Sequence, residues 1–100
     1  MAASTPIAEL VARLASPDAR VRRIAVRDLA AAGRDGLAAI VGRLPAETDE
    51  QTRILMVRVL GEACFAPAMA ALACIRDDPS TSAELFHAAI LAHDRAEAAR

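Results

Sequence analysis

Apolar residues recur along the chain with the spacing of amphipathic helices, and short polar turns interrupt them. The first stretch places Ile7, Leu10, Val11 and Leu14 on one stripe of a helix. Residues 4–6 offer a capping hydroxyl followed by Pro, and residues 16–18 form a turn. The pattern therefore predicts a first helix between these two signals.

The same signals predict five further helices, over about residues 18–32, 37–44, 49–63, 67–75 and 81–92. Asp18 is suited to cap the second helix, Asp49 or Thr48 the fourth, and Gly33 suits the left-handed position that ends the second. The inward-facing side chains of the second helix are expected to be Val21, Ile24, Ala25, Leu29 and Ala32. A polar, Ala-rich tail begins at His93, and residues 94–100 of it lie outside the last repeat unit. This tail either continues the last helix or frays.

One segment of the chain returns in related form. Residues 18–29 match residues 49–60, with the same offset of 31 at every matched position. The identities pair Asp18 with Asp49, Arg22 with Arg53, Val26 with Val57, Arg27 with Arg58 and Leu29 with Leu60. Self-similarity at a fixed period of this size predicts a stacked repeat architecture.

A third copy fits the same period less well. Phe86 and Leu91 continue two of the apolar series, but the two arginine positions become Glu84 and Ala89. A terminal repeat is usually atypical because one of its faces meets solvent. We therefore expect a single domain over residues 1–100, an all-α solenoid of three stacked helix–turn–helix units at about 4–33, 36–64 and 67–93.

The repeated pattern resembles a known family of helical repeats. The pattern is Asp18-x-x-Val21-Arg22-x-x-Ala25-x-x-x-Leu29-x-x-x-Gly33. It is similar to the HEAT-like repeats first described in phycobilin lyase proteins. The second copy keeps the Asp, Arg and Leu but replaces the small Ala by Met56 and the closing Gly by Cys64. The resemblance implies the solenoid fold, and for function it implies scaffolds, lyase components, assembly factors or nucleic-acid-binding proteins.

Composition and charge narrow the class of protein. Apolar residues make up 55% and aromatic residues 2%, so the core must be built from small and aliphatic side chains, mostly good helix formers. The net charge is −1, every basic side chain is Arg, and neither Tyr nor Trp is present to stack on bases, which makes nucleic acid an unlikely partner. There is no signal peptide pattern and no apolar run of membrane-spanning length. These features predict a cytoplasmic protein with reduced thiols and no membrane contact.

The first repeated pair of charges has a structural interpretation. Asp18 and Asp49 are placed to cap helices, and Arg22 and Arg53 follow them by four positions. The HEAT-like resemblance implies that these four residues form a ladder in which each Arg bonds a neighbouring turn or repeat. The alternative is an anion site.

The second repeated pair, Arg27 and Arg58, lies mid-helix and is not explained by capping. Arg20, Arg23 and Arg27 share one helix face, and second helices line the concave, partner-binding face of solenoids. With Arg58 they form a candidate basic stripe for an acidic partner. The alternative is a solvated face that acids such as Asp28, Glu47 and Glu50 neutralise.

Metal and catalytic signatures are weak. Glu84 and His87 have a spacing seen in di-iron bundles, but no matching inward carboxylates accompany them, and His87 aligns with Ala25 as a partly buried helix residue. Cys64 and Cys74 lack zinc spacing and lie late in helices, where the dipole disfavours a thiolate. The sequence predicts no catalytic residues, no metal, no cofactor and no enzymatic activity.

The leading hypothesis is a non-catalytic scaffold that binds an acidic protein partner through the concave face of its second helices. Self-association is a second expectation, because the units at both ends leave apolar faces exposed. Residues 1–33 carry five Arg against three acids, and residues 67–100 carry three Arg against five acids, so the ends attract each other. The alternative function, implied by the resemblance, is an accessory subunit of a lyase, isomerase or cofactor-assembly system that binds a tetrapyrrole or another anionic ligand.

Overall fold

The computed structural model describes residues 6–99 and is built from helices alone within that range. They are α1 (Ile7–Arg13), α2 (Ala19–Ala31), α3 (Arg34–Arg43), α4 (Glu50–Glu62), α5 (Met69–Asp77) and α6 (Ala83–Ala98), with 3₁₀ turns at Leu44–Ala46 and Ala66–Ala68. The predicted all-α class is confirmed. The predicted capping hydroxyls at residues 4 and 5 lie outside the described residues. In the described range, no helix combines the length and the apolar character needed to cross a membrane.

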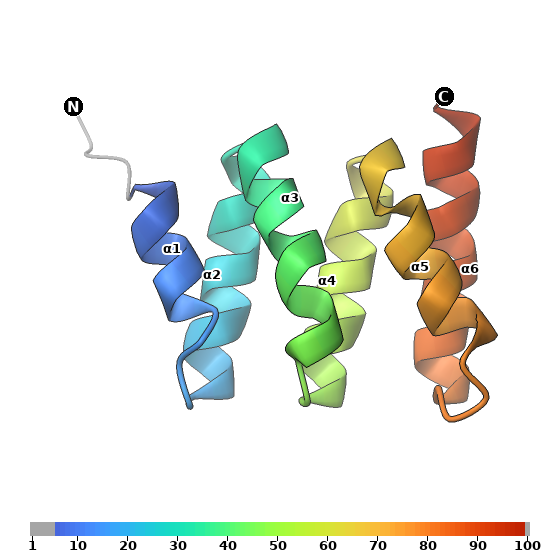
Figure 1. Cartoon of the computed structure of the whole chain (residues 1–100), viewed down its shortest axis with the longest axis horizontal. Coiled ribbons are helices and arrows are strands. Elements are labelled where there is room, and N and C mark those ends of the chain that lie inside the picture. The colour runs from blue at the N-terminus through green and yellow to red at the C-terminus, as the bar shows by residue number, and fades with distance from the viewer. Residues whose placement is uncertain (1–5, 100) are drawn as a thin grey trace.

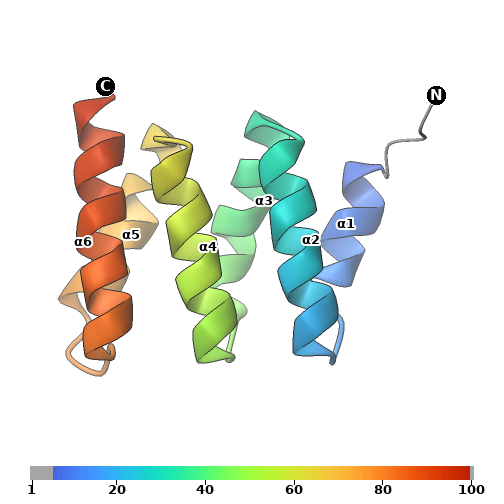
Figure 2. The same cartoon turned by 180° about the vertical axis from the view of Figure 1, so that it is seen from behind.

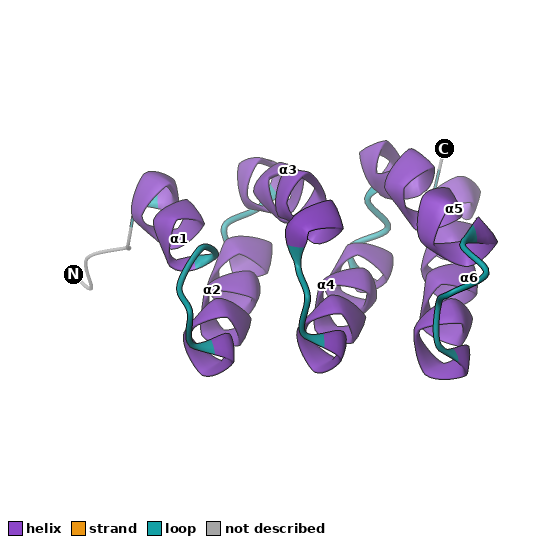
Figure 3. Ribbon diagram, turned by 60° about the horizontal axis from the view of Figure 1, so that its bottom comes forward, coloured by secondary structure: helices purple, strands orange, loops and turns teal. Residues whose placement is uncertain are grey.

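The six helices form two layers of three (Figure 1). Helices α1, α3 and α5 make one layer, and α2, α4 and α6 stand side by side in the other, as the view from behind shows (Figure 2). Short turns join successive helices, so the chain passes back and forth between the layers (Figure 3). The molecule is a slab with principal extents of 42 × 31 × 16 Å.

The core lies between the layers and is almost entirely aliphatic. Its largest fully buried apolar side chains are Leu14, Leu29, Ile40, Leu44, Met56, Leu60, Leu72, Leu85, Val26 and Val57. Phe65 is the aromatic residue among the buried hydrophobic residues of the described range. The small side chains allow close packing: a Cβ added to Gly61 of α4 would lie 2.8 Å from Ala92 Cα on α6. The backbones of α4 and α6 therefore approach each other closely at Gly61 and Ala92.

Each second helix begins with a side-chain cap. Asp18 accepts the N–H of Arg20, Asp49 accepts the N–H of Thr52, and Ser82 Oγ accepts the N–H of Leu85. The caps predicted at Asp18 and Asp49 are confirmed, and Asp49 rather than Thr48 is the one that acts in α4. Because a cap satisfies an N–H that the helix cannot, each one fixes where its helix starts.

The turns that precede these caps repeat as well. Ser16 Oγ accepts the N–H of Asp18, and Glu47 accepts the N–H of Asp49. In the third turn Asp78 accepts the N–H of Ser80 in the same way. In the first two turns this N–H belongs to the cap itself, whereas in the third the cap is Ser82, two residues further on. The period of 31 therefore holds through Ser80, and the chain departs from it before α6 begins.

Two helix ends differ from the expectation. Helix α3 begins at Arg34 because Gly33, with φ +94°, turns the chain directly into it. Helix α6 continues to Ala98, so most of the polar tail is helical. Cys64, two residues after the end of α4, has φ +51°, and the Phe65 N–H donates to Leu60 O. Cys64 thus has a positive φ at the position that aligns with Gly33, although it is not a glycine.

The late start of α6 changes which of its residues reach the core. A strict period of 31 maps the buried residues of α2 onto Glu84, His87, Ala88 and Leu91. The buried residues are instead Leu85, Ala89, Ala92 and Ala96. Leu91 is 51% exposed, whereas its counterparts Leu29 and Leu60 are fully buried. The expectations that His87 is partly buried and that Phe86 and Leu91 continue the apolar series inward are wrong, because the core-facing stripe has moved by one residue.

The inward set predicted for α2 also needs correction. Ile24 is 58% exposed and Ala32 is exposed, whereas Val26, which was not in the set, is fully buried. The buried stripe of α2 consists of Arg22, Ala25, Val26 and Leu29. Ile24 lies on the opposite face, which leaves a large apolar side chain among charged neighbours.

Candidate functional site

The four repeated arginines, Arg22, Arg53, Arg27 and Arg58, occupy four different environments. The first is a buried ion pair between Arg22 and Glu47. Arg22 Nε donates to both carboxylate oxygens of Glu47 at 3.0 and 3.2 Å, and its Nη1 donates to Ser16 O at 2.7 Å. The Glu47 carboxylate also accepts the N–H groups of Thr48 and Asp49. Arg22 therefore ties the turn before α2 to the turn before α4.

Arg53, which aligns with Arg22, has no equivalent ion pair in the described part of the chain. Asp78 is the residue that aligns with Glu47, and the charge of Arg53 helps to lower its pKa. The larger causes of that lowering are the hydrogen bonds from the N–H and hydroxyl of Ser80. Arg53 Nε is buried and has no hydrogen-bond partner in the part of the chain that the structure describes. The later turn has therefore moved its carboxylate to the surface, and Arg53 is held near it without bonding.

The cap of α4 is an acidic hydrogen-bond centre. Asp49 accepts from the Thr52 hydroxyl at 2.6 Å and from the Thr52 N–H at 2.9 Å. These two bonds, with smaller contributions from the charges of Arg23 and Arg22, lower the pKa of Asp49. Arg23 lies 4.0 Å from the Asp49 carboxylate, so one of the candidate binding arginines is partly engaged.

Arg20, Arg23 and Arg27 lie on the outer face of α2, where they line a shallow depression together with Ile24. We call these four residues the α2 basic face. Arg20 and Arg27 are exposed, and neither side chain forms a salt bridge with any residue of 6–99. Glu47, one of the acids that the solvated-face alternative would use to neutralise this region, is buried on Arg22 instead. Sequence reasoning missed Ile24 as a member of the face because its spacing also fits an inward stripe.

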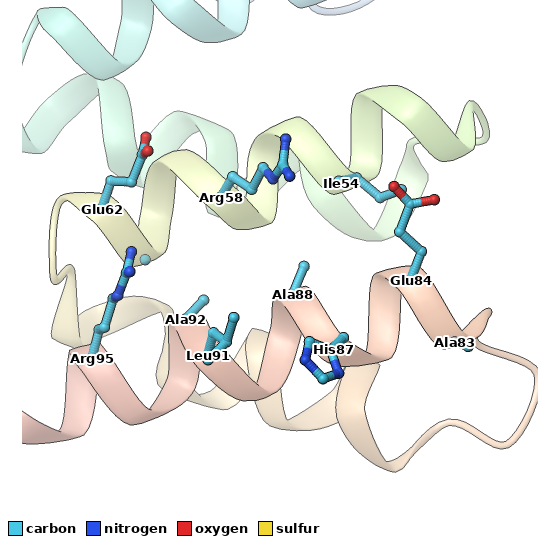
Figure 4. Close-up of a pocket in the computed structure, with 11 residues that line it drawn as sticks. Ile54, Arg58, Glu62, Ala83, Glu84, His87, Ala88, Leu91, Ala92 and Arg95 are labelled. Atoms are coloured by element: carbon cyan, nitrogen blue, oxygen red, sulfur yellow. The ribbon is translucent and has the colours of Figure 1, made fainter.

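Arg58 lies in a second, larger depression. This α4–α6 groove has a volume of about 680 Å³ and is lined from both helices (Figure 4). Its apolar residues are Ile54, Gly61, Ala83, Ala88, Leu91 and Ala92, and its polar residues are Arg58, Glu62, Glu84, His87 and Arg95. Arg58 and Arg27 are aligned on neighbouring helices of one layer, but the depressions that they line are separate. The structure therefore brings together three of the four predicted binding residues and places the fourth in the groove.

The charges of the groove alternate along it. In the close-up, Glu84 lies at one end, Arg95 and Glu62 lie at the other, and Arg58 lies between them (Figure 4). Two cations and two anions line the groove, so its lining has no net charge apart from any charge on His87. None of the four forms a salt bridge with another residue between Pro6 and Ala99. Four exposed charges that the chain leaves unpaired are available to a second molecule.

A third cluster lies at the end of α6. His93, Asp94 and Glu97 bring ligand atoms within 4.8 Å of one another, and the His93 ring lies 3.9 Å from Glu97. Arg76 on α5 donates to Asp77, and this bond, together with the charges of Asp77, Asp94 and Glu97, raises the pKa of Arg76.

The two thiols are on the surface. Cys64 and Cys74 are both free and exposed. Neither residue lines the α2 basic face or the α4–α6 groove.

Comparisons with known proteins give no relative for this chain: no family model, no curated protein and no solved structure matches it. The geometry of the described residues is therefore the basis for a functional assignment.

Proposed function

We propose that this chain is a non-catalytic interaction module, built from three HEAT-like helix pairs, that binds an acidic segment of another protein. The period of 31, the repeated caps and the repeated turn bonds support the assignment of the helix pairs as repeats. The second helices stand side by side in one layer, which gives them a continuous outer surface. A surface of this kind suits recognition of an extended partner.

The proposal rests on the environment of Ile24, an exposed apolar residue among arginines. A 58% exposed isoleucine lies among three arginines, two of which form no salt bridge within the described residues. An exposed aliphatic side chain gains free energy when a partner covers it, and unpaired guanidinium groups attract carboxylates. The α2 basic face therefore fits a segment in which an apolar residue is flanked by Asp or Glu. Arg58 extends the cationic surface to the next helix.

Affinity purification with quantitative mass spectrometry tests this proposal in the native cell. The variants are Ile24→Glu and Arg27→Glu, both at exposed positions of α2, and the matched control is Arg34→Glu, an exposed arginine of α3 in the other layer. We expect the acidic partner to be lost with both α2 variants and retained with the control. Binding should also weaken as ionic strength rises, because exposed charge pairs are screened. Equal recovery with Ile24→Glu, Arg27→Glu and the unaltered chain would refute the proposal.

A further inference from the structure

The displaced stripe of α6 is the most unusual surface of the molecule. Glu84, His87, Ala88 and Leu91 occupy the positions that face the core in α2, yet on α6 they line the α4–α6 groove. The stripe thus exposes a leucine between Glu84 and Arg95, which form no salt bridge among residues 6–99. Such surfaces are typical of sites that another helix covers.

The spacing of this stripe is symmetric. Glu84, Ala88, Leu91 and Arg95 follow one another at steps of four, three and four residues, which is the spacing of a coiled-coil seam. Read backwards, the spacing is the same, with the acid at one end and the base at the other. A two-fold axis across the middle of the stripe therefore places Glu84 opposite Arg95 of a second copy, and Ala88 opposite Leu91 of that copy.

We propose that the chain forms a two-fold symmetric dimer in which the α6 helices pair antiparallel across the α4–α6 groove. The occupant of each groove is the α6 helix of the second copy. Charge complementarity selects it: the two-fold axis sets the acid of each copy opposite the base of the other, and the two cations of the lining equal its two anions. A strongly acidic or basic segment would meet like charges at one end of the groove.

The small side chains of the groove suit this arrangement. No large side chain projects from α6 at three positions of the groove, which are Ala83, Ala88 and Ala92. Gly61 has the same effect on α4. A second helix is thus able to approach closely, and the Leu91 side chains of the two copies insert on either side of the axis. The seam is short, so we expect a weak, reversible dimer rather than an obligate one.

This inference does not depend on the proposed function, because its seam lies on α6 and includes no residue of the α2 basic face. It differs from attraction between the oppositely charged ends of the chain, because an end-to-end contact is not closed and leads to larger oligomers. The two-fold contact stops at the dimer.

Sedimentation velocity over a range of concentrations tests the dimer, with circular dichroism to confirm that every variant is folded. Leu91→Glu should shift the protein to monomer, and Glu84→Arg or Arg95→Glu alone should each weaken the dimer by about tenfold or more, since each reversal sets like charges opposite one another. The double variant E84R/R95E exchanges the two charges and should recover most of the association. Ile24→Glu is the control that should leave the dimer unchanged, and it separates this test from that of the α2 basic face.

Each other outcome overturns the inference. A chain that stays monomeric at about millimolar concentration, where even a weak complex is populated, lacks the dimer. Association that Leu91→Glu does not change uses another surface, and growth beyond a dimer indicates end-to-end contacts. A double variant no stronger than the single variants rules out the antiparallel pairing of Glu84 with Arg95.

Discussion

Helices α2 and α6 occupy the same layer and derive from the same repeated pattern, yet they present opposite surfaces. Helix α2 buries its aligned residues and exposes Arg20, Ile24 and Arg27. Helix α6 exposes its aligned residues, among them Leu91, and buries the next stripe around its axis. The cause lies in the turn before α6, where the cap falls at Ser82 rather than at Ser80. A change of two residues in a turn has therefore converted a core stripe into a surface stripe.

The contact between the first and second helix pairs also differs from the contact between the second and third. Arg22 and Glu47 join the first two units through a buried ion pair, whereas the aligned Asp78 is exposed and bonds its own turn. In the third unit, Ser82 instead donates its hydroxyl hydrogen to Glu50 at the start of α4. The first junction thus depends on charge burial, and the second depends on the close contact of α4 with α6.

The largest effect on stability is expected where the first and second helix pairs meet, and it is compared with the effect at the aligned position between the second and third pairs. Glu47→Ala leaves Arg22 buried without a counter-ion and should lower the free energy of unfolding by about 3–5 kcal/mol. Asp78→Ala removes an exposed carboxylate from the aligned position and should lower it by no more than about 1 kcal/mol. Urea unfolding of both variants measures the difference. Equal losses would mean that the two turns are equivalent, as a strict repeat requires.

A smaller effect tests the contact between α4 and α6. Gly61→Ala adds a Cβ that would lie 2.8 Å from Ala92 and should destabilise the protein by about 1–3 kcal/mol. The aligned residue of α2 is Ala30, so the first junction already accepts a methyl group at this place. Gly42→Ala is the matched control, because nothing lies within 4 Å of the added Cβ, and it should be neutral or stabilising. A neutral Gly61→Ala variant would show that α4 and α6 are further apart.

The smallest effect concerns the caps and depends on pH. The pKa of Asp49 is lowered in the folded protein by its bonds to Thr52, so its contribution to stability is present above the unfolded pKa and is lost as the pH falls through the folded value. The cap of α6 is the hydroxyl of Ser82, which does not titrate in this range. Below about pH 4 the Thr52 amide should lose hydrogen-exchange protection before the Leu85 amide does. Asp49→Ser should abolish the difference, and equal acid sensitivity of both amides in the unaltered chain would contradict the account.

Much of the fold was available from the sequence because it depends on local signals. The caps at Asp18 and Asp49, the turn at Gly33 and the all-helical class follow from residue types that act within one turn of a helix. The partner of Arg22 was not predicted, because Glu47 is 25 residues away and looks like an ordinary turn acid.

The surface of α6 could not be read from the sequence for a different reason. Alanine occupies so many of its positions that two stripes are equally suited to the core: one through Leu85 and Ala89, and one through Ala88 and Leu91. The period of 31 favoured the second stripe, and packing against α4 and α5 selected the first. The prediction of the basic stripe omitted Ile24 for the same reason, because the spacing of Ile24 fits either the buried or the exposed face of α2.

Thiol labelling at the aligned leucines tests directly whether the stripe of α6 that contains Leu91 is on the surface. With Cys64 and Cys74 replaced by Ser, single cysteines are introduced by Leu29→Cys, Leu60→Cys and Leu91→Cys, and labelling is followed at a concentration where the chain is monomeric. The account predicts that the thiol at position 91 reacts at nearly the rate of the unfolded chain, while those at positions 29 and 60 react only as fast as the protein opens. A thiol at position 91 as protected as the one at position 60 would show that α6 faces the core with the strict repeat, and the surface proposed for the dimer would not exist.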